Sequence, residues 1–272
     1  MSEAVGELFG PGGGAGLLER DWFLEALQAS MADVAEGRGR LVLVAGEAGI
    51  GKTALVREFC DLRRARQRVL WGACDGLRTP RPLAPFVDMA AGSGGTFAGT
   101  VARGERPAGC FAALTDELAA AGPTIVVIED LHWADEATLD VVTMLGRRAE
   151  AVPALVVATY RDDELAADHP LRSVLGQLRV EYGVRRLVLT PLSLAAVAAL
   201  AAPTGADADG LYRVTAGNPF FLTEVLAAGS ERIPETVRDA VLARAGRLTG
   251  AARRLLEAVA VVPGSVEVSL LE

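Results

Sequence analysis

The segment with the clearest potential for chemistry is residues 46–53, which read GEAGIGKT and follow the apolar run LVLVA. The GxxxxGK[ST] spacing is that of a P-loop, whose backbone N–H groups surround nucleotide phosphates. Lys52 is expected to neutralise β- and γ-phosphate oxygens, and the Thr53 hydroxyl is expected to bind Mg²⁺. The expected nucleotide contacts are Gly46, Glu47, Ala48, Gly49, Ile50, Gly51, Lys52 and Thr53.

The composition of the chain argues against a chance match. Lys52 is the only lysine among 27 basic residues, and the chain has 30 glycines. A lone lysine would have the required glycines and hydroxyl residue around it by chance roughly once in a thousand. The segment therefore predicts a site for ATP and Mg²⁺.

Two acids, Glu129 and Asp130, follow the β-branched run TIVVI at residues 124–128. Parallel sheets bind ligands outside the carboxyl ends of their strands, and Mg²⁺ prefers hard oxygen ligands. The pair predicts a Walker B site, although the usual order is Asp first. We favour Glu129 at the metal and Asp130 as the general base. The reverse assignment stays open. So does the alternative that both acids are solvated residues at the end of a strand and hold no metal.

Three further positions have weaker signals. Arg161 follows another apolar run, so it could sense a γ-phosphate or merely cap the sheet. Asn218 and Pro219 open a helix, as cap and first-turn residue. His132 and Trp133 come just after the acids, and we expect a buried hydrogen-bonded pair rather than catalysis. His169 is assigned no role.

These residues need strands and helices to position them. Unbroken apolar runs predict strands, and spacings of three and four residues predict helices. The expected strands are 41–45, 68–72, 124–128, 154–159 and 186–189; the expected helices are 20–37, 52–66, 111–121, 136–147 and 171–178. Turn residues predict a surface loop at 91–109. After residue 193 the periodicity is helical throughout: 193–202, 208–215, 220–228, 234–247 and 250–261.

This order predicts an α/β fold, a three-layer P-loop NTPase with a parallel sheet, followed by a smaller all-helical lid domain. The expected boundaries are a flexible N-terminal segment at 1–17, the nucleotide-binding domain at 18–191, the helical lid at 192–248, and the start of a truncated winged-helix-like domain at 249–272.

Composition limits the classes of function. A net charge of −8 and a pI near 5.0 argue against nonspecific nucleic-acid binding, which needs clustered basic residues. Cys60, Cys74 and Cys110 lie far apart without a paired CxxC spacing, so neither a zinc site nor a disulfide framework is suggested. We therefore expect reduced cytosolic thiols. No leader segment or membrane span is expected. We therefore expect a cytoplasmic protein without membrane contact.

The motifs together resemble the STAND class of signalling P-loop ATPases, relatives of AAA+ proteins. The segments GEAGIGKT, IEDLHWADE, TYRDDEL, GNPFFLTEV and IPETVRDAVLARAGRL resemble the ATPase module of large ATP-binding LuxR-type transcriptional regulators. The resemblance implies a switch between ATP and ADP states that can form homo-oligomers. It also implies Arg161 as sensor, Pro219 beside adenine, and Arg20 near the base, although Glu19 stands where relatives have glycine.

The leading hypothesis is a regulatory ATPase with slow Mg²⁺-dependent hydrolysis, acting with downstream domains of a longer protein. Direct DNA binding by this stretch is not expected. The alternatives are a small-molecule phosphotransferase, a scaffold that keeps ADP without turnover, and the same module attached to a cyclase or protein kinase.

Overall fold

The structure is a computed structural model that describes residues 16–77, 79–93, 95–104, 106–178, 182–229, 234–246 and 248–262. The chain divides into two units, Leu17–Leu192 and Ser193–Glu272 together with Met1–Gly16. Most of the expected flexible segment 1–17 lies outside the described residues, as does the end of the expected domain at 249–272.

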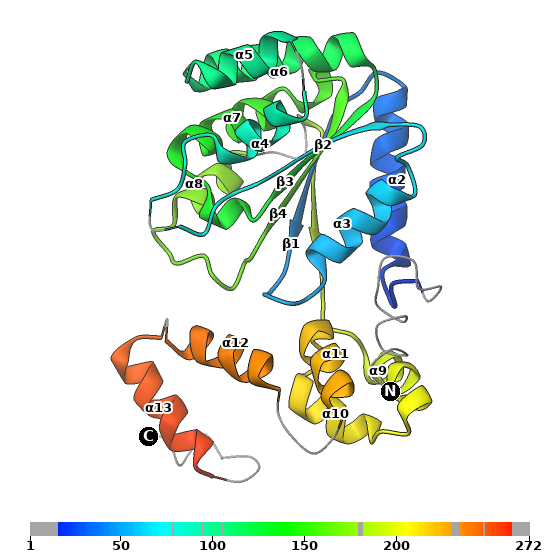
Figure 1. The fold of residues 1–272 in the computed structure, drawn as a ribbon, viewed down its shortest axis with the longest axis vertical. Coiled ribbons are helices and arrows are strands. Elements are labelled where there is room, and N and C mark those ends of the chain that lie inside the picture. The colour runs from blue at the N-terminus through cyan, green and yellow to red at the C-terminus, as the bar shows by residue number, and fades with distance from the viewer. Residues whose placement is uncertain are drawn as a thin grey trace. The chain divides into compact units, whose positions relative to one another are not determined.

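A parallel sheet of five strands forms the centre of the first unit, in the order β2-β3-β4-β1-β5 (Figure 1). The strands are β1 (Arg40–Ala45), β2 (Arg68–Ala73), β3 (Thr124–Glu129), β4 (Ala154–Tyr160) and β5 (Val184–Val188). Every residue of β3 and β4 is buried. This burial explains the apolar runs IVVI and ALVVA within them, because helices cover both faces of a parallel sheet.

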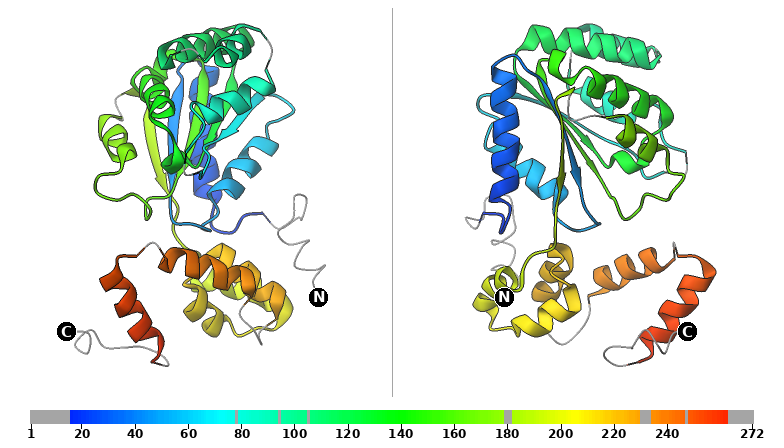
Figure 2. Two further views of the ribbon diagram at one scale, coloured as in Figure 1. Left: turned by 60° about the vertical axis from the view of Figure 1, so that its left-hand side comes forward. Right: turned by 180° about the vertical axis from the view of Figure 1, so that it is seen from behind.

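Helices form the two outer layers of this unit (Figures 1 and 2). They are α2 (Asp21–Ala35) and α3 (Lys52–Asp61) on one face, and α4 (Ala84–Ala91), α5 (Gly95–Ala102), α6 (Pro107–Ala121), α7 (Glu136–Arg147) and α8 (Pro170–Gln177) on the other side. Alternate residues of β1 divide between two cores: Leu41 and Leu43 join one, and Val42 and Val44 the other. The predicted three-layer α/β fold is confirmed.

The expectation of a surface loop at 91–109 is wrong. Residues Gly95–Ala102 form α5, and α6 already begins at Pro107. Phe97 is fully buried and Val101 is 9% exposed, four residues apart on one helical face. Glycines around α5 hide this spacing, because they are read as turn signals even where an apolar pair fixes a helix.

In the second unit, all regular secondary structure of the described residues is helical. Its α-helices are α9 (Leu194–Ala201), α10 (Ala208–Thr215), α11 (Pro219–Ala228), α12 (Glu235–Ala245) and α13 (Gly250–Ala260). Side chains cap several of them: Ser193 accepts a hydrogen bond from Ala196 N, and Thr249 accepts one from Ala252 N. The helical character predicted from residue 193 onward is therefore confirmed for these residues.

Candidate functional site

The P-loop connects β1 to α3. Gly46, Gly49 and Gly51 have φ angles of 147°, 80° and 97°, which suit glycine and strain other residues. A Cβ on Gly46 would lie 2.9 Å from Ile50 Cγ2 and 3.1 Å from Leu189 O. Gly51 is the N-cap of α3, so the N–H groups of the first turn of α3 lie at the loop. This is a backbone cradle suited to anionic oxygens.

The Lys52 ammonium lies inside this loop. Its Nζ donates to Gly46 O at 2.7 Å and to Glu47 O at 2.9 Å, and the residue is 7% exposed. Burial lowers the pKa of Lys52, and the positive charge of Arg161 lowers it further, whereas Asp130 raises it. The cation therefore shares one electrostatic environment with side chains that follow β3 and β4.

Glu129 is the last residue of β3 and Asp130 follows it, and the two side chains have different surroundings. Glu129 is 8% exposed, and its Oε2 accepts a hydrogen bond from Trp71 Nε1 at 2.9 Å. Its buried Oε1 has no partner among the described residues. The Asp130 side chain is 30% exposed. Burial raises the pKa of Asp130, and the positive charge of Arg161 opposes that shift.

The next strand contributes Thr159 and Arg161 to the same sheet edge. Asp130 N donates to Thr159 Oγ1 at 3.1 Å, which ties the turn after β3 to the end of β4. The guanidinium of Arg161 donates to Glu164 Oε1 at 2.6 Å and lies over the Trp133 ring, with Cζ 5.0 Å from the centroid. The structure thus brings Lys52, Asp130 and Arg161 to one edge, as parallel strands require.

The expectation of a hydrogen-bonded His132 is wrong. His132 is buried at 5% exposure, but neither ring nitrogen has a hydrogen-bond partner among the described residues. Nδ1 lies 3.9 Å from Asp130 Oδ1, and Nε2 lies 3.8 Å from Glu164 Oε2. Burial lowers the pKa of His132 to about 4, so the ring is neutral at pH 7. His169, which was given no role, places Nε2 3.1 Å from His132 O.

Arg20 lies at the amino end of α2 and is 4% exposed. Its Nη2 donates to Ile50 O at 3.2 Å and to Thr190 O at 2.9 Å. Burial lowers its pKa. The guanidinium therefore joins the P-loop to the residues after β5 through backbone carbonyls.

Pro219 belongs to the helical unit, where it is the first residue of α11. Asn218 is 2% exposed, and its Oδ1 accepts from Phe220 N at 3.1 Å. These two residues are the start of a capped helix within their own unit.

Sequence reasoning missed Trp71 and Glu164. Trp71 contacts Glu129 and Glu164 contacts Arg161, and the sequence predicts only Glu129 and Arg161 as site residues. Trp71 is two residues from the end of β2, which pairs in parallel with β3. A prediction that these two strands are neighbours would have placed Trp71 near Glu129. Glu164 stands three residues after Arg161, a spacing that gave no signal by itself.

Within the described residues, no group of three or more His, Cys, Asp or Glu side chains could hold a metal alone. Thr53, Glu129 and Asp130 supply hydroxyl and carboxylate oxygens, the donor chemistry of Mg²⁺ sites completed by phosphates and water. None of the described helices is both long and apolar enough to cross a bilayer.

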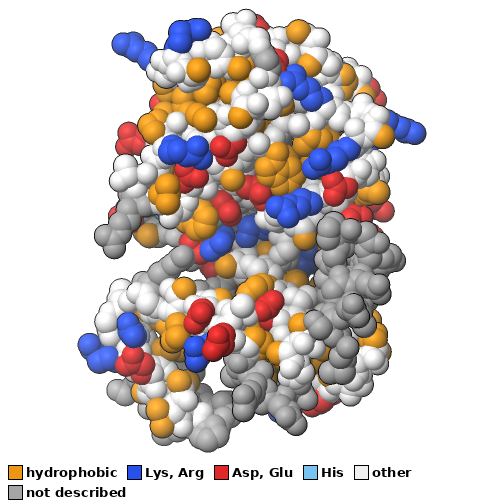
Figure 3. All heavy atoms as spheres, viewed as in Figure 1, with side chains coloured by type: hydrophobic (Ala, Val, Ile, Leu, Met, Phe, Trp, Pro, Cys, Tyr) orange, Lys and Arg blue, Asp and Glu red, His pale blue; other side chains and the backbone are white. Residues whose placement is uncertain are grey.

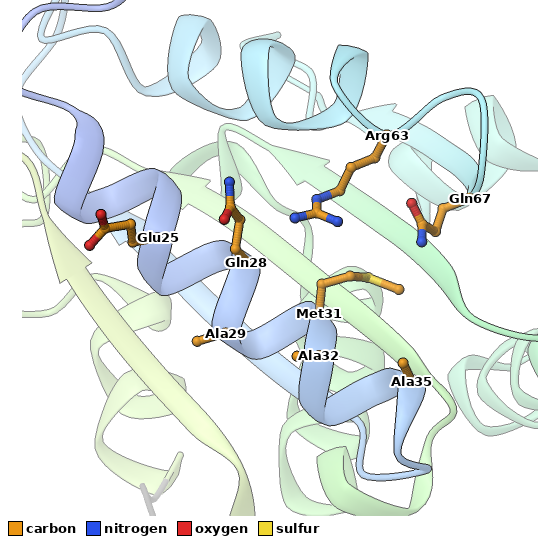
Figure 4. A pocket seen from close by; sticks show the side chains of 8 residues that line it. All are labelled: Glu25, Gln28, Ala29, Met31, Ala32, Ala35, Arg63 and Gln67. Carbon is orange, nitrogen blue, oxygen red and sulfur yellow. The ribbon is translucent and has the colours of Figure 1, made fainter.

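A cavity of about 480 Å³ lies elsewhere, between α2 and the turn after α3 (Figure 4). It is lined by Glu25, Gln28, Ala29, Met31, Ala32, Ala35, Arg63 and Gln67. None of these is a candidate site residue. On the face of this unit seen in Figure 3, acidic and basic side chains alternate rather than gather.

Several known proteins are similar to this chain. A protein of Rhizobium meliloti (strain 1021), named only as uncharacterized, is 27% identical, and the match covers 98% of this chain and 31% of that protein. The chain thus spans about a third of the length of that relative.

Solved structures share the fold. The STAND protein with a tetratricopeptide repeat sensor from Pyrococcus horikoshii has a TM-score of 0.50 at 16% identity, covering 90% of this chain and 35% of that one. The Aeropyrum pernix Orc1 protein, solved in complex with DNA, has a TM-score of 0.56 at 14% identity, covering 95% and 76%. Residues 16–157 match the family described as AAA ATPase domain. The chain therefore belongs to the AAA ATPase domain family.

Proposed function

We propose that the chain is a STAND-type nucleotide switch, the ATP-binding regulatory module of a LuxR-type transcriptional regulator, with slow Mg²⁺-dependent ATP hydrolysis. The observation that carries the nucleotide part is the convergence of Lys52, Asp130 and Arg161 at the carboxyl edge of the sheet. The resemblance of its motifs to those of large LuxR-type regulators supports the regulatory part.

In this proposal the backbone of residues 46–53 and the Lys52 ammonium hold the phosphates. Thr53 and Glu129 would hold Mg²⁺, which would neutralise phosphate charge there. Asp130 accepts a proton from the attacking water, and the raised pKa of its carboxyl suits that role. Arg161 contacts the γ-phosphate.

The proposed adenine contacts are Arg20 and Pro219, which rest on the family resemblance alone. The bonds of Arg20 to Ile50 O and Thr190 O support a second role, in which it braces the P-loop. The proposed protein is cytoplasmic and acts with downstream domains of a longer chain. It forms homo-oligomers that depend on the bound nucleotide. Gel filtration with ADP and with a nonhydrolysable ATP analogue tests the oligomer, and identical profiles would count against it.

The decisive experiment is calorimetric titration of ATP and ADP, with Mg²⁺, into the wild type and Lys52→Ala. The variant loses the single ammonium in the cradle, so we expect affinity to fall at least about 100-fold, as for a lost charge-assisted contact of about 3 kcal/mol. Arg64→Ala is the matched control, since Arg64 pairs with Asp61 at an exposed site beyond α3. Unchanged affinity in Lys52→Ala would sink the P-loop assignment.

A further inference from the structure

Arg161 is held by groups of its own chain. The guanidinium donates to Glu164 Oε1 at 2.6 Å, and their side chains are 23% and 15% exposed. Charge-assisted hydrogen bonds of this length are stronger than neutral ones, and partial burial limits screening. Glu164 is therefore a competitor for whatever anion Arg161 binds.

The second support of Arg161 is the face of Trp133, whose ring centroid lies 5.0 Å from Cζ. Backbone packing fixes this ring on another side. A Cβ on Gly76 would lie 3.1 Å from Trp133 Cδ2, so the turn after β2 sits directly against the indole. The His132 ring lies 4.6 Å from it, centroid to centroid. Arg161 thus rests on a surface that cannot easily shift.

The paired arginine remains electrostatically close to the phosphate cradle. Its positive charge lowers the pKa of both Lys52 and Asp130. A γ-phosphate beside Lys52 would attract Arg161 and repel the Glu164 carboxylate. ADP has no γ-phosphate, so only ATP has to weaken the ion pair between Arg161 and Glu164.

We infer that Glu164 is a positioning residue that sets the discrimination between ATP and ADP, by competing with the terminal phosphate for Arg161. The inference rests on the proposed role of Arg161 as the γ-phosphate contact. Glu164 holds Arg161 against Trp133 in the ADP state and lowers the affinity for ATP. The switch therefore responds only where ATP is abundant enough to displace this contact.

The test is a double-mutant cycle with Glu164→Gln and Arg161→Gln, read by calorimetry with ADP and a nonhydrolysable ATP analogue. We expect Glu164→Gln to tighten binding of the analogue about threefold to fivefold, the upper range of a partly exposed ion pair, and to change ADP affinity less than twofold. In the Arg161→Gln background we expect the same change to tighten the analogue less, because only the direct repulsion between Glu164 and the γ-phosphate remains.

Two variants control the cycle. Asp162→Asn removes one negative charge from the same loop, and we expect it to change the affinities for both nucleotides by the same factor. Glu164→Asp keeps the charge with a shorter reach and should lie between wild type and Glu164→Gln. It also serves as the test variant if Glu164→Gln loses its native circular dichroism.

The outcomes separate the two ideas. If Arg161→Gln leaves the affinity for the analogue unchanged, the sensor role falls and the inference with it. If Arg161→Gln weakens the analogue but Glu164→Gln weakens it too, leaves it unchanged, or acts equally in the Arg161→Gln background, only the inference is overturned.

Discussion

Asp130 occupies a left-handed backbone conformation, with φ at 54°. Non-glycine residues adopt this region at a cost, and Asp and Asn tolerate it better than most because their short polar side chains bond locally. Asp130→Asn therefore changes charge without adding backbone strain, whereas Asp130→Ala would change both. Asp130 lies just beyond the strand with its side chain 30% exposed, whereas Glu129 is the buried last residue of the strand.

The proposed division of roles between the acids predicts distinct losses. Asp130→Asn should retain nucleotide binding and slow phosphate release about 100-fold to 10,000-fold, as expected for a lost general base. Glu129→Gln should instead raise the Mg²⁺ concentration needed for half-maximal release. Both are measured by phosphate release over a Mg²⁺ titration, with Asp140→Asn on the exposed side of α7 as control. The reverse pattern would swap the two roles.

At the scale of elements, one side chain joins two helices on the same face of the sheet. Asp135 Oδ2 accepts from Ala137 N at 3.0 Å and caps α7, while Oδ1 accepts from Leu83 N at 3.1 Å, at the start of α4. Leu83 is itself left-handed, with φ at 56°. The carboxylate thus fixes the beginnings of α4 and α7 together.

Asp135→Ala should lower the free energy of unfolding by about 2 to 3 kcal/mol, because it removes a cap and leaves the Leu83 N–H without its acceptor. Urea unfolding followed by circular dichroism measures the loss. Asp140→Ala, exposed on the same helix, should change stability by less than about 0.5 kcal/mol. Equal losses in the two variants would contradict the bridging role.

Sequence predicted elements well where one local pattern decides them, and poorly where distant contacts do. The P-loop is contiguous, and β3 and β4 contain apolar runs of strand length, so strand, loop and helix could be placed in advance. α5 was missed because its helical state depends on burying Phe97 in the core. The same reason applies to Trp71, whose contact with Glu129 crosses from one strand to another.

At the scale of the whole unit Leu17–Leu192, Asp33 connects a helix to two strands. Its carboxylate accepts from Arg38 at 2.8 Å and from Arg40 at 2.9 Å, and Arg185 of β5 lies 3.6 Å away. The Arg38 and Arg40 guanidinium groups hold the pKa of Asp33 below its usual value. A lowered carboxyl pKa adds stability above the unfolded pKa, and that stability disappears as pH falls through the folded value.

Asp33→Asn should therefore lower the free energy of unfolding at pH 7 by about 1 to 2 kcal/mol. The difference from wild type should begin to shrink as the pH falls below about 4, where the unfolded carboxyl becomes protonated, and should disappear as the pH passes through the lower folded pKa. Urea unfolding at pH 7 and at pH 3 measures this, with the exposed pair of Asp61 and Arg64 tested by Asp61→Asn as control. A difference independent of pH would show that charge is not the cause.

The strand order also governs how the protein is made. The strand that leads into the P-loop pairs with the last two strands of its sheet: Arg40 with Leu155, and Leu41 with Val184. Such long-range pairing is slow, and a chain grows from its N-terminus. During synthesis the apolar run LVLVA emerges before its partner strands β4 and β5. Until they are made, this run can aggregate or be bound by chaperones. The residues from beyond β4 and β5 that lie beside the P-loop, Arg161 and Thr190, are made later still.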